Sequence, residues 1–459
     1  MLTELKKIHF IGIGGSGMSA IARVLLEQGY KVSGSDLSES EIVQKLKDLG
    51  AKIYKGHCAE NIIGVDAIVV STAIAKSNPE VMAAIDNNIP VYHRSDIVAT
   101  LLNNERGIAV AGAHGKTTTT SMLAVLLDVA GVDPTAIIGG EVDYLQSNAK
   151  LGKGEYLVAE ADESDGSFLK LLPEIAIVTN IENDHMDYYG TMENILETFK
   201  NFLQNLSKES GLAVLCFDNE YIRNLAPVIE RKFISYALNH DADFMAKNIV
   251  TDGANTLFDV YKGKEKLGRI KLNVPGKHNV SNALGAIVVC HTLGIDIETI
   301  QKGFNYFNGA KRRFQTKGKA QGVWVVDDYA HHPTEINTTL LAARQTNPKR
   351  LICAFQPHRY SRTHLLLKEF TECFKESDML VLTEIYSAGE QPIEGVSGKL
   401  LAERITSKTQ KEVVYIEERS KMAEYLKEIV RDGDLVITMG AGDIYLTGEE
   451  LLSKLNSNK

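Results

Sequence analysis

A repeated alternation of short apolar runs with helical patterns constrains this fold most. Over the first hundred residues the apolar runs are KIHFIGI, KVSGSD, AKIYKG, DAIVVSTAI and PVYHR, and helical patterns follow the first two. Strands that alternate with helices are typical of a parallel, doubly wound sheet, because each helix crosses one face before the next strand begins. We therefore predict an α/β protein that starts with a Rossmann-like domain.

Two further cycles of the same kind follow. The second opens at GIAVAGAHGKTTTT and closes with a helical stretch over 278–293, and inside it FMAKNIV, TLFDVYKG and GRIKLNV predict antiparallel strands. The third runs from GVWVVDDYA to DLVITMGAG. A chain of 459 residues is too long for one core, and polar stretches interrupt the pattern near Asn104 and Gly309. We expect three α/β domains over 1–104, 105–309 and 310–459.

Charge and hydropathy exclude several classes of partner. The formal net charge of -9 argues against nucleic acid or an anionic membrane surface as the main partner. The sequence contains no uninterrupted apolar run of membrane-spanning length, and its first residues lack the pattern of a signal peptide. We expect a cytoplasmic protein, and the sequence leaves a monomer and a homodimer both open.

A glycine-rich turn follows the first predicted strand. Gly12, Gly14 and Gly17 form GxGxxG before a helical pattern, and Asp36 closes the second strand. Such a turn lets the backbone approach a pyrophosphate, while a strand-end acid can bind a ribose hydroxyl. Nicotinamide enzymes, flavoproteins and sugar-nucleotide binders share this pattern, and a simple tight turn also fits it.

A second glycine turn, AGAHGKTTTT, follows the strand GIAVA. Its backbone amides, Lys116 and the Thr117 hydroxyl are suited to phosphate oxygens and Mg²⁺, so a phosphate-binding loop of the P-loop type is predicted in the central α/β domain. The glycine spacing is two residues shorter than the general pattern, and a threonine-rich helix start is the alternative.

Acidic and basic clusters follow other strands. VAEADESD carries Glu160, Asp162, Glu163 and Asp165, whose mutual repulsion favours a cation site, although a solvated acidic loop has the same composition. His185 follows another buried strand. PGKHNVSNA places three polar side chains at a helix start, where they fit either an adenine edge or an N-cap. DDYAHHPTEI and FQPHRYSR place His358, Arg359 and Arg362 at a sheet edge, as an anion site or a solvated face.

These motifs together resemble the Mur ligase family. The matching segments are GIGGSGMSAIA, AGAHGKTTTT, AEADESDGSF, TNIENDHMDYY, PGKHNVSNA, KRRFQ, DDYAHHPTE, FQPHRYSR and MGAGDI. The resemblance covers the whole chain and implies a UDP-binding domain, a central ATPase domain and a C-terminal Rossmann-like domain. Within the family it favours the branch that adds L-alanine to the lactyl carboxylate of UDP-N-acetylmuramate, using ATP and Mg²⁺ and an acyl phosphate, in peptidoglycan precursor synthesis.

The resemblance also implies roles for individual residues. For the UDP-sugar these are Gly14, Gly15, Ser16, Gly17, Met18, Ser19, Asp36, Ser71 and Thr72. For ATP they are Gly112, Ala113, His114, Gly115, Lys116, Thr117, Thr118, His278, Asn279, Asn282, Arg313 and Asp328. The metal ligands are Thr117, Glu160 and His185, and the amino-acid residues are Tyr329, His331, Arg359 and Arg362. Lys116, His185, Arg359 and Arg362 are expected to be catalytic.

Three alternatives stay open at this point. A ligase of the same family that reattaches recycled tripeptide shares the motifs, and GGSGMSAIA favours the alanine branch. A nicotinamide-dependent oxidoreductase accounts for GIGGSG and Asp36 but leaves the phosphate loop unexplained. A non-catalytic nucleotide switch leaves the first domain and the basic cluster without a purpose. Ala113 departs from the threonine usual in the family, and Lys200 is interpreted as an exposed helical lysine.

Overall fold

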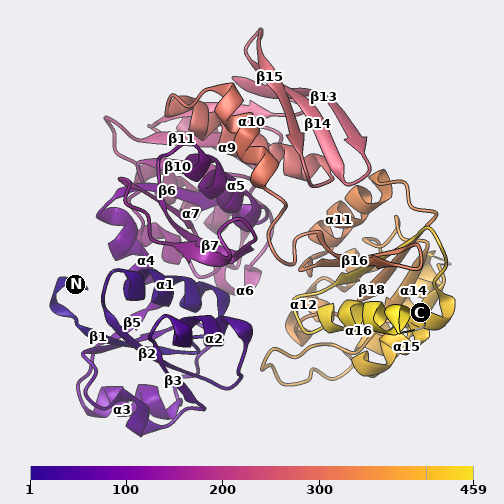
Figure 1. Cartoon of the computed structure of the whole chain (residues 1–459), viewed down its shortest axis with the longest axis horizontal. Helices are drawn as coiled ribbons and strands as arrows, with labels where there is room; N and C mark the ends of the chain where they lie inside the picture. Colours follow the sequence, from indigo (N-terminus) through magenta and orange to yellow (C-terminus); the bar gives the residue numbers. More distant parts are fainter. Residues whose placement is uncertain (1, 410, 458–459) are drawn as a thin grey trace. The chain divides into compact units, whose positions relative to one another are not determined.

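The computed structural model describes residues 2–409 and 411–457, which form three sheets flanked by helices (Figure 1). The described residues group into two compact units. The first runs to Asn248 and also includes Phe258–Ile270 and Ser281–Asn308. The second includes Ile249–Leu257, Lys271–Val280 and the chain from Gly309 onward.

The first sheet is parallel throughout, with the strand order β3-β2-β1-β4-β5. Its strands are β1 (Lys7–Ile11), β2 (Lys31–Asp36), β3 (Lys52–Lys55), β4 (Ala67–Val70) and β5 (Val91–His93). Its helices are η1 (Leu2–Glu4), α1 (Ser16–Glu27), α2 (Glu41–Asp48), η2 (Ala59–Ile62), α3 (Pro79–Asp86) and α4 (Arg94–Asn103). The order reverses between β1 and β4, so the loops that follow these two strands open a crevice at the carboxyl edge.

The second sheet has ten strands in the order β15-β14-β13-β12-β11-β10-β6-β9-β7-β8. Its strands are β6 (Arg106–Ala111), β7 (Thr135–Val142), β8 (Ser147–Lys150), β9 (Tyr156–Glu160), β10 (Ile175–Val178), β11 (Leu212–Cys216), β12 (Lys232–Ala237), β13 (Phe244–Asp252), β14 (Asn255–Lys262) and β15 (Glu265–Leu272). Its helices are α5 (Lys116–Val129), η3 (Ser167–Lys170), α6 (Met186–Tyr189), α7 (Met192–Gln204), α8 (Glu220–Leu225), η4 (Ala226–Val228), α9 (Lys277–Thr292) and α10 (Ile297–Tyr306). The short links between β13, β14 and β15 are of the kind that joins antiparallel neighbours, as the sequence predicted.

The third sheet has the order β16-β17-β21-β18-β19-β20, and only β16 pairs antiparallel among its described strands. The strands are β16 (Gln315–Ala320), β17 (Val323–Asp328), β18 (Arg350–Phe355), β19 (Met379–Leu382), β20 (Val413–Tyr415) and β21 (Asp434–Met439). The helices are α11 (Pro333–Gln345), α12 (Tyr360–Leu365), α13 (Leu367–Phe370), α14 (Gly398–Thr409), α15 (Arg419–Ile429) and α16 (Tyr445–Asn456).

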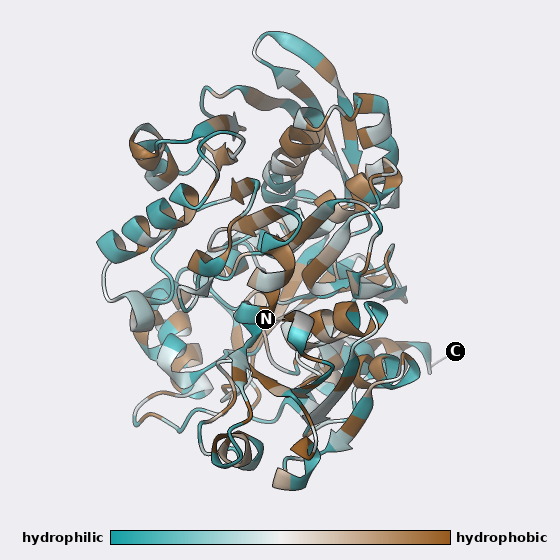
Figure 2. Ribbon diagram, turned by 90° about the vertical axis from the view of Figure 1, so that its left-hand side faces the viewer, coloured by the Kyte–Doolittle hydropathy of each residue, from teal (hydrophilic) through white to brown (hydrophobic). Residues whose placement is uncertain are grey.

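Both faces of the third sheet are buried. Along β18, Leu351, Cys353 and Phe355 belong to one apolar cluster, while Ile352 and Ala354 belong to the cluster on the opposite face. Side chains of a strand alternate between faces, so a strand covered on both sides is apolar along its whole length. Figure 2 shows this distribution, with hydrophobic residues along the strands and hydrophilic residues on outer helical faces and loops.

The sequence pattern missed strands whose composition is not that of a buried strand. β16 has the sequence QTKGKA and lies at the edge of its sheet, where one neighbour suffices and little apolar surface is buried. β8, with the sequence SNAK, lies at the edge of the second sheet. Among the described residues no helix combines the length and apolarity needed to cross a membrane.

Candidate nucleotide and substrate sites

The turn between β6 and α5 depends on two glycines. Gly112 has φ of 133°, and a Cβ there would lie 2.2 Å from the Thr179 hydroxyl and 2.9 Å from the Asn180 carbonyl. Gly115 has φ of 85° and is the N-cap of α5, and a Cβ there would lie 2.5 Å from Asn282 Oδ1. L side chains rarely adopt such φ values, so the fold requires glycine at both positions. The turn therefore brings backbone amides to a helix start, which is the arrangement that binds phosphate.

Lys116, the first residue of α5, folds back over this turn. Its Nζ donates to the carbonyls of Gly112 at 2.6 Å and Ala113 at 3.2 Å, and to Glu163 Oε1 at 2.8 Å. Burial lowers the pKa of Lys116, but the nearby carboxylates of Glu163 and Asp162 outweigh it and raise the pKa above its usual value. The ammonium is therefore charged and available to phosphate oxygens at neutral pH.

The predicted metal ligands Thr117 and Glu160 lie side by side. The Thr117 hydroxyl is 3.2 Å from Glu160 Oε2, and Glu160 Oε1 accepts the backbone N–H of Gly139 at 2.5 Å. A Cβ on Gly139 would lie 2.7 Å from Glu160 Oε2, so glycine lets the carboxylate pack against the backbone of β7. A hydroxyl and a carboxylate are hard oxygen ligands, which fit the preference of Mg²⁺.

His185 lies near Glu163, the carboxylate that also accepts from Lys116. It is the N-cap of the short helix α6, with a left-handed φ of 55° that is uncommon for a residue other than glycine. Its Nε2 is 3.7 Å from Glu163 Oε1 and 3.6 Å from Asp184 Oδ2. The Tyr189 hydroxyl donates to the carbonyl of Glu163. Glu163 thus lies between Lys116 and His185, although sequence reasoning gave it no individual role.

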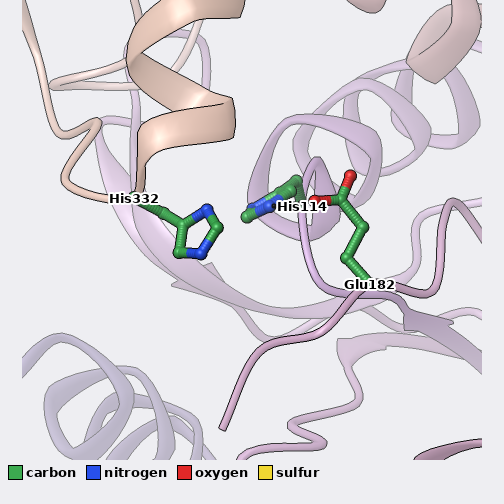
Figure 3. Close-up of side chains that lie close together, drawn as sticks. All are labelled: His114, Glu182 and His332. Atoms are coloured by element: carbon green, nitrogen blue, oxygen red, sulfur yellow. Dashed lines mark ion pairs between the residues drawn. The ribbon is translucent and has the colours of Figure 1, made fainter. Parts of the chain in front are cut away.

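Two residues that the sequence reasoning missed hold the phosphate loop. Asn180 Oδ1 accepts the N–H of His114 at 2.8 Å, and the side chains of Asn180 and Thr179 donate to the His114 carbonyl at 2.8 and 2.6 Å. Both follow β10 in the segment TNIEN, and their position directly after a buried strand was the available signal. Figure 3 shows the His114 ring beside Glu182, with His114 Nε2 3.3 Å from Glu182 Oε2. His332, also drawn, belongs to the second unit and is the N-cap of α11.

The turn between β1 and α1 is held by the end of β2. The Ser35 carbonyl accepts the N–H groups of Gly12 at 2.8 Å and Ile13 at 3.1 Å, and Asp36 Oδ2 accepts the N–H of Gly14 at 2.9 Å. Asp36 Oδ1 accepts from Ser38. Gly15 is the N-cap of α1. The strand, glycine turn and helix are arranged as the sequence predicted, but Asp36 bonds the turn itself.

Four more residues predicted for the UDP-sugar fall into two groups, and a fifth, Ser16, donates its hydroxyl to the Gly139 carbonyl. Ser71 and Thr72 follow β4, which pairs with β1, so both lie at the carboxyl edge beside the glycine turn. Met18 and Ser19 are buried in α1, and the Ser19 hydroxyl accepts from Asn148 at 2.9 Å. Packing thus occupies both of these side chains, and only their backbone remains as a candidate for ligand contact.

A pocket lies between the starts of α1 and α5, the two helices that follow the glycine turns. Its cavity volume is about 140 Å³, the space of about five water molecules. Gly17 in the first turn of α1, Lys116 at the start of α5 and the metal candidate Glu160 line it, together with the ion pair between Arg94 and Asp162. The Arg94 guanidinium holds the pKa of Asp162 well below its usual range, although burial opposes this. The pocket therefore has carboxylates for a cation and cations for an anion in one small volume.

The predicted adenine residues lie at the start of α9. His278 and Asn279 are in its first turn, and Asn279 Nδ2 donates to the Pro275 carbonyl at 2.7 Å. Asn282 lies in the second turn, not the first as the sequence suggested, because the helix begins at Lys277. In the first unit the Asn282 amide lies against Gly115, beside the phosphate loop. Burial lowers the pKa of His278 to about 4, so its ring is neutral at physiological pH.

A ring cluster lies at the carboxyl edge of the third sheet. The His331 ring centroid is 5.3 Å from Tyr329 and 5.8 Å from His358, and His358 stacks on Tyr386 at 5.7 Å. Burial lowers the pKa of His331 to about 4 and that of His358 to about 3. Arg362 Nη1 is 3.3 Å from His358 Nδ1. The cluster therefore places two neutral histidine rings beside the guanidinium of Arg362.

Three more predicted residues belong to this unit. Arg359 is the N-cap of α12 with φ of 72°, which is sparsely populated for a residue with a side chain. Arg313 lies over the Tyr329 ring at 5.3 Å. Asp328 accepts the N–H groups of Phe314 and Ala330, both at 2.7 Å, and burial raises its pKa to about 6. Asp328 thus shapes the edge of the sheet, and its part in binding ATP stays a prediction.

Family models match successive parts of the chain. The model described as Mur ligase family, catalytic domain, matches residues 7–106. The Mur ligase middle domain matches residues 110–290, and the Mur ligase, glutamate ligase domain, matches residues 312–442.

Individual relatives match over the full length. A UDP-N-acetylmuramate--L-alanine ligase from Geotalea daltonii is 50% identical over 455 residues, 99% of this chain and 99% of that protein. The crystal structure of a UDP-N-acetylmuramate-alanine ligase from Thermotoga maritima matches with a TM-score of 0.85 and 29% identity, covering 99% of this chain and 100% of that one. A murein peptide ligase from Psychrobacter arcticus, 24% identical with a TM-score of 0.73 and 98% coverage of both chains, shares the fold.

Proposed function

The chain belongs to the Mur ligase family, and from that membership we propose that it joins L-alanine to the lactyl carboxylate of UDP-N-acetylmuramate with hydrolysis of ATP to ADP and phosphate. The product is a precursor of peptidoglycan. The half-identical, full-length relatives carry the name of this activity, which distinguishes it from other reactions of the family.

The observation that carries the proposal is the pocket between the starts of α1 and α5, the helices that follow the two glycine turns. Ligation requires the carboxylate of the sugar nucleotide to meet the γ-phosphate of ATP, so the two nucleotide sites must share one small space. Gly17 and Lys116 line the same cavity, together with Glu160. An enzyme that transferred hydride from a nicotinamide would have no need for a lysine, a hydroxyl and carboxylates at the second turn.

The residues beside Lys116 fit a magnesium ion. Thr117 and Glu160 offer hydroxyl and carboxylate oxygens 3.2 Å apart, and the carboxylates near Lys116 and His185 add negative charge. When bound, Mg²⁺ would neutralise phosphate charge and hold the triphosphate for in-line transfer. We propose Thr117, Glu160 and His185 as the residues that hold magnesium, directly or through water.

The reaction follows from activating a poor electrophile. A lactyl carboxylate oxygen attacks the γ-phosphorus, the bond to the β-γ bridging oxygen breaks, and ADP leaves. The neutral amine of alanine then attacks the acyl carbon, loses a proton, and phosphate departs as the amide forms. Lys116 binds the transferred phosphoryl oxygens and Arg94 offers charge to the carboxylate, so positioning and charge neutralisation replace a covalent nucleophile.

The third sheet supplies the proposed amino-acid site. Arg359 and Arg362 would pair with the carboxylate of alanine, since guanidinium groups bind carboxylates through two parallel hydrogen bonds. Tyr329 and His331 would line the same site, with the His331 ring neutral because burial lowers its pKa to about 4. Arg313 and Asp328 would contact ATP from the same domain. The adenine of ATP would contact three residues of α9, His278, Asn279 and Asn282. We also propose that the three domains meet near residues 104 and 309.

Activity of the purified protein tests the function. Incubation with UDP-N-acetylmuramate, ATP, Mg²⁺ and single amino acids should release phosphate and yield a product heavier by one alanine residue. The tripeptide L-alanyl-γ-D-glutamyl-meso-diaminopimelate in place of alanine tests the recycling reaction, and NAD or NADP tests the oxidoreductase. Preference for the tripeptide, or turnover of nicotinamide without phosphate release, would refute the proposal.

We further propose that the enzyme is cytoplasmic and either monomeric or homodimeric.

A further inference from the structure

A carboxylate without solvent contact lies inside the first domain, beside the end of β2. Glu80 is in the first turn of α3, and its side chain has no exposed area. The Ser35 hydroxyl donates to Glu80 Oε2 at 2.6 Å, and Asn61 Nδ2 donates to Oε1 at 2.6 Å. His57 Nδ1 lies 2.9 Å from Oε2, and His9 Nε2 lies 3.4 Å from Oε1. These four partners come from three segments of the domain: His9 from β1, Ser35 from β2, and His57 and Asn61 from the stretch after β3.

Burying a charged carboxylate is costly unless hydrogen bonds compensate for the lost water. Here burial alone would raise the pKa of Glu80, but its hydrogen bonds with His9, Ser35 and Asn61 outweigh that effect and lower the pKa to about 2. Glu80 is therefore ionised at physiological pH and accepts on both oxygens. A glutamine of the same shape can accept on one oxygen only and presents an NH₂ group to the partners of the other.

The partners of Glu80 lead directly to the first glycine turn. Ser35 is the residue whose carbonyl accepts the N–H groups of Gly12 and Ile13. The next residue, Asp36, accepts the N–H of Gly14. Glu80 thus holds the side chain of Ser35, and the backbone of Ser35 holds the turn. The other partners of Glu80 connect Ser35 to β1 and to the segment after β3.

We propose that Glu80 is a positioning residue for the sugar-nucleotide site, acting through Ser35 on the turn Gly12–Gly14. The inference rests on the proposed binding of the UDP-sugar at this turn. It assigns a purpose to an ionised group in the interior of the domain: the carboxylate contacts four polar partners at once and so fixes the end of β2 more rigidly than an apolar side chain would.

Hydrogen exchange tests the structural half of this inference without any ligand. In Glu80→Gln, exchange of the backbone amides of residues 10–17 should accelerate by at least about tenfold, while exchange of residues 112–119, the second glycine turn, should stay as in the parent. The matched control is Asp259→Asn, which removes another buried carboxylate of the same unit, bonded to Asn248 and Lys266. Unchanged exchange at residues 10–17 in a folded Glu80→Gln protein would overturn the proposal, whether or not UDP-sugar binds there.

Steady-state kinetics test the functional half. Glu80→Gln should raise the KM for UDP-N-acetylmuramate by at least about tenfold and change the KM for ATP by less than about twofold, with Asp259→Asn close to the parent in both. If Glu80→Gln does not fold, Ser35→Ala removes one of the four bonds and should give a smaller rise in the same KM. Equal changes in both KM values, or a Ser35→Ala protein with parental KM values, would overturn the positioning role. A parent protein that binds no UDP-sugar would instead refute the proposed function.

Discussion

The two glycine turns of the first unit occupy equivalent positions and have opposite chemistry. Each follows a strand that pairs in parallel with both neighbours, begins with a glycine at positive φ, and ends at a helix whose N-cap is glycine. The N-cap glycine is extended in the first turn and left-handed in the second. In the first turn the group that lies on the backbone is a carboxylate, Asp36, which accepts the N–H of Gly14. In the second it is an ammonium, Lys116, which donates to the carbonyls of Gly112 and Ala113.

This difference shows how a glycine turn between a strand and a helix can serve two different ligands. Glycine spacing decides only that amides are presented at a helix start. The charged side chain decides what the turn can hold: a lysine neutralises phosphate, whereas a strand-end acid is suited to a hydroxyl or an amide. The buried carboxylates beside the two turns also differ. Hydrogen bonds lower the pKa of Glu80, beside the first turn, to about 2, whereas burial raises the pKa of Glu163, beside the second turn.

Replacement of Lys116 by alanine should separate the two turns most strongly. Ligation should fall by at least about a thousandfold, since phosphate neutralisation of this kind contributes about 4 kcal/mol or more to the transition state. UDP-N-acetylmuramate should still bind in calorimetry, because the first turn is intact. The control is Lys150→Ala, which removes a partly buried lysine paired with Asp128 and Asp133 in the same unit. Parental turnover by Lys116→Ala would show that the second turn is not the ATP site.

Replacement of Asp36 by alanine should affect the first turn alone. The lost hydrogen bonds to Gly14 and Ser38 should weaken UDP-N-acetylmuramate binding by about 1 to 3 kcal/mol, with little change in the KM for ATP. Asp66→Ala is the matched control, because Asp66 accepts the N–H groups of Lys6 and Lys7 at the opposite edge of the same sheet. Equal weakening by both variants would mean that the effect is on the domain and not on the turn.

Substitution of Arg359 or Arg362 by lysine leaves both glycine turns intact and tests the binding of the amino acid, which neither turn is proposed to contact. Lysine cannot form two parallel bonds to a carboxylate, so the KM for alanine should rise or turnover fall by at least about tenfold, equivalent to about 1.4 kcal/mol. ATP affinity measured without alanine should stay the same. Arg344→Lys serves as the control, since Arg344 pairs with Asp378 in the same unit. Parental alanine kinetics in both variants would move amino-acid capture to other residues.

Lowering the pH should remove the contribution of Glu80, the carboxylate beside the first turn, to the free energy of unfolding. A pKa of about 2 in the folded chain and 4.5 in the unfolded chain means that Glu80 contributes stability above pH 4.5, and that this contribution is lost as pH falls toward about 2. By pH 4 the loss amounts to about 1 kcal/mol. Urea unfolding followed by circular dichroism between pH 6 and 4 should show the difference between parent and Glu80→Gln narrowing by that amount. A difference that stays constant over this range would mean that folding does not lower the pKa of Glu80.

Local sequence signals determined much of this protein. The apolar runs predicted the three sheets and the parallel strands at their centres, because a strand covered on both faces must be apolar along its length. Gly12, Gly112 and Gly115 marked turns that only glycine can make, and Lys116 beside the second turn indicated a phosphate site. These features depend on a few neighbouring residues, so the sequence suffices to find them.

Only the tertiary structure decided which distant side chains complete each turn. Asn180 holds the phosphate loop from 66 residues away, and Glu80 holds Ser35 from 45 residues away. Arg94 enters the pocket from α4, in a segment without any motif. A lone asparagine, glutamate or arginine carries no local signal of such a role, because hydrogen bonds and charge pairs depend on distance in space, which the chain sets only when the sheets have formed.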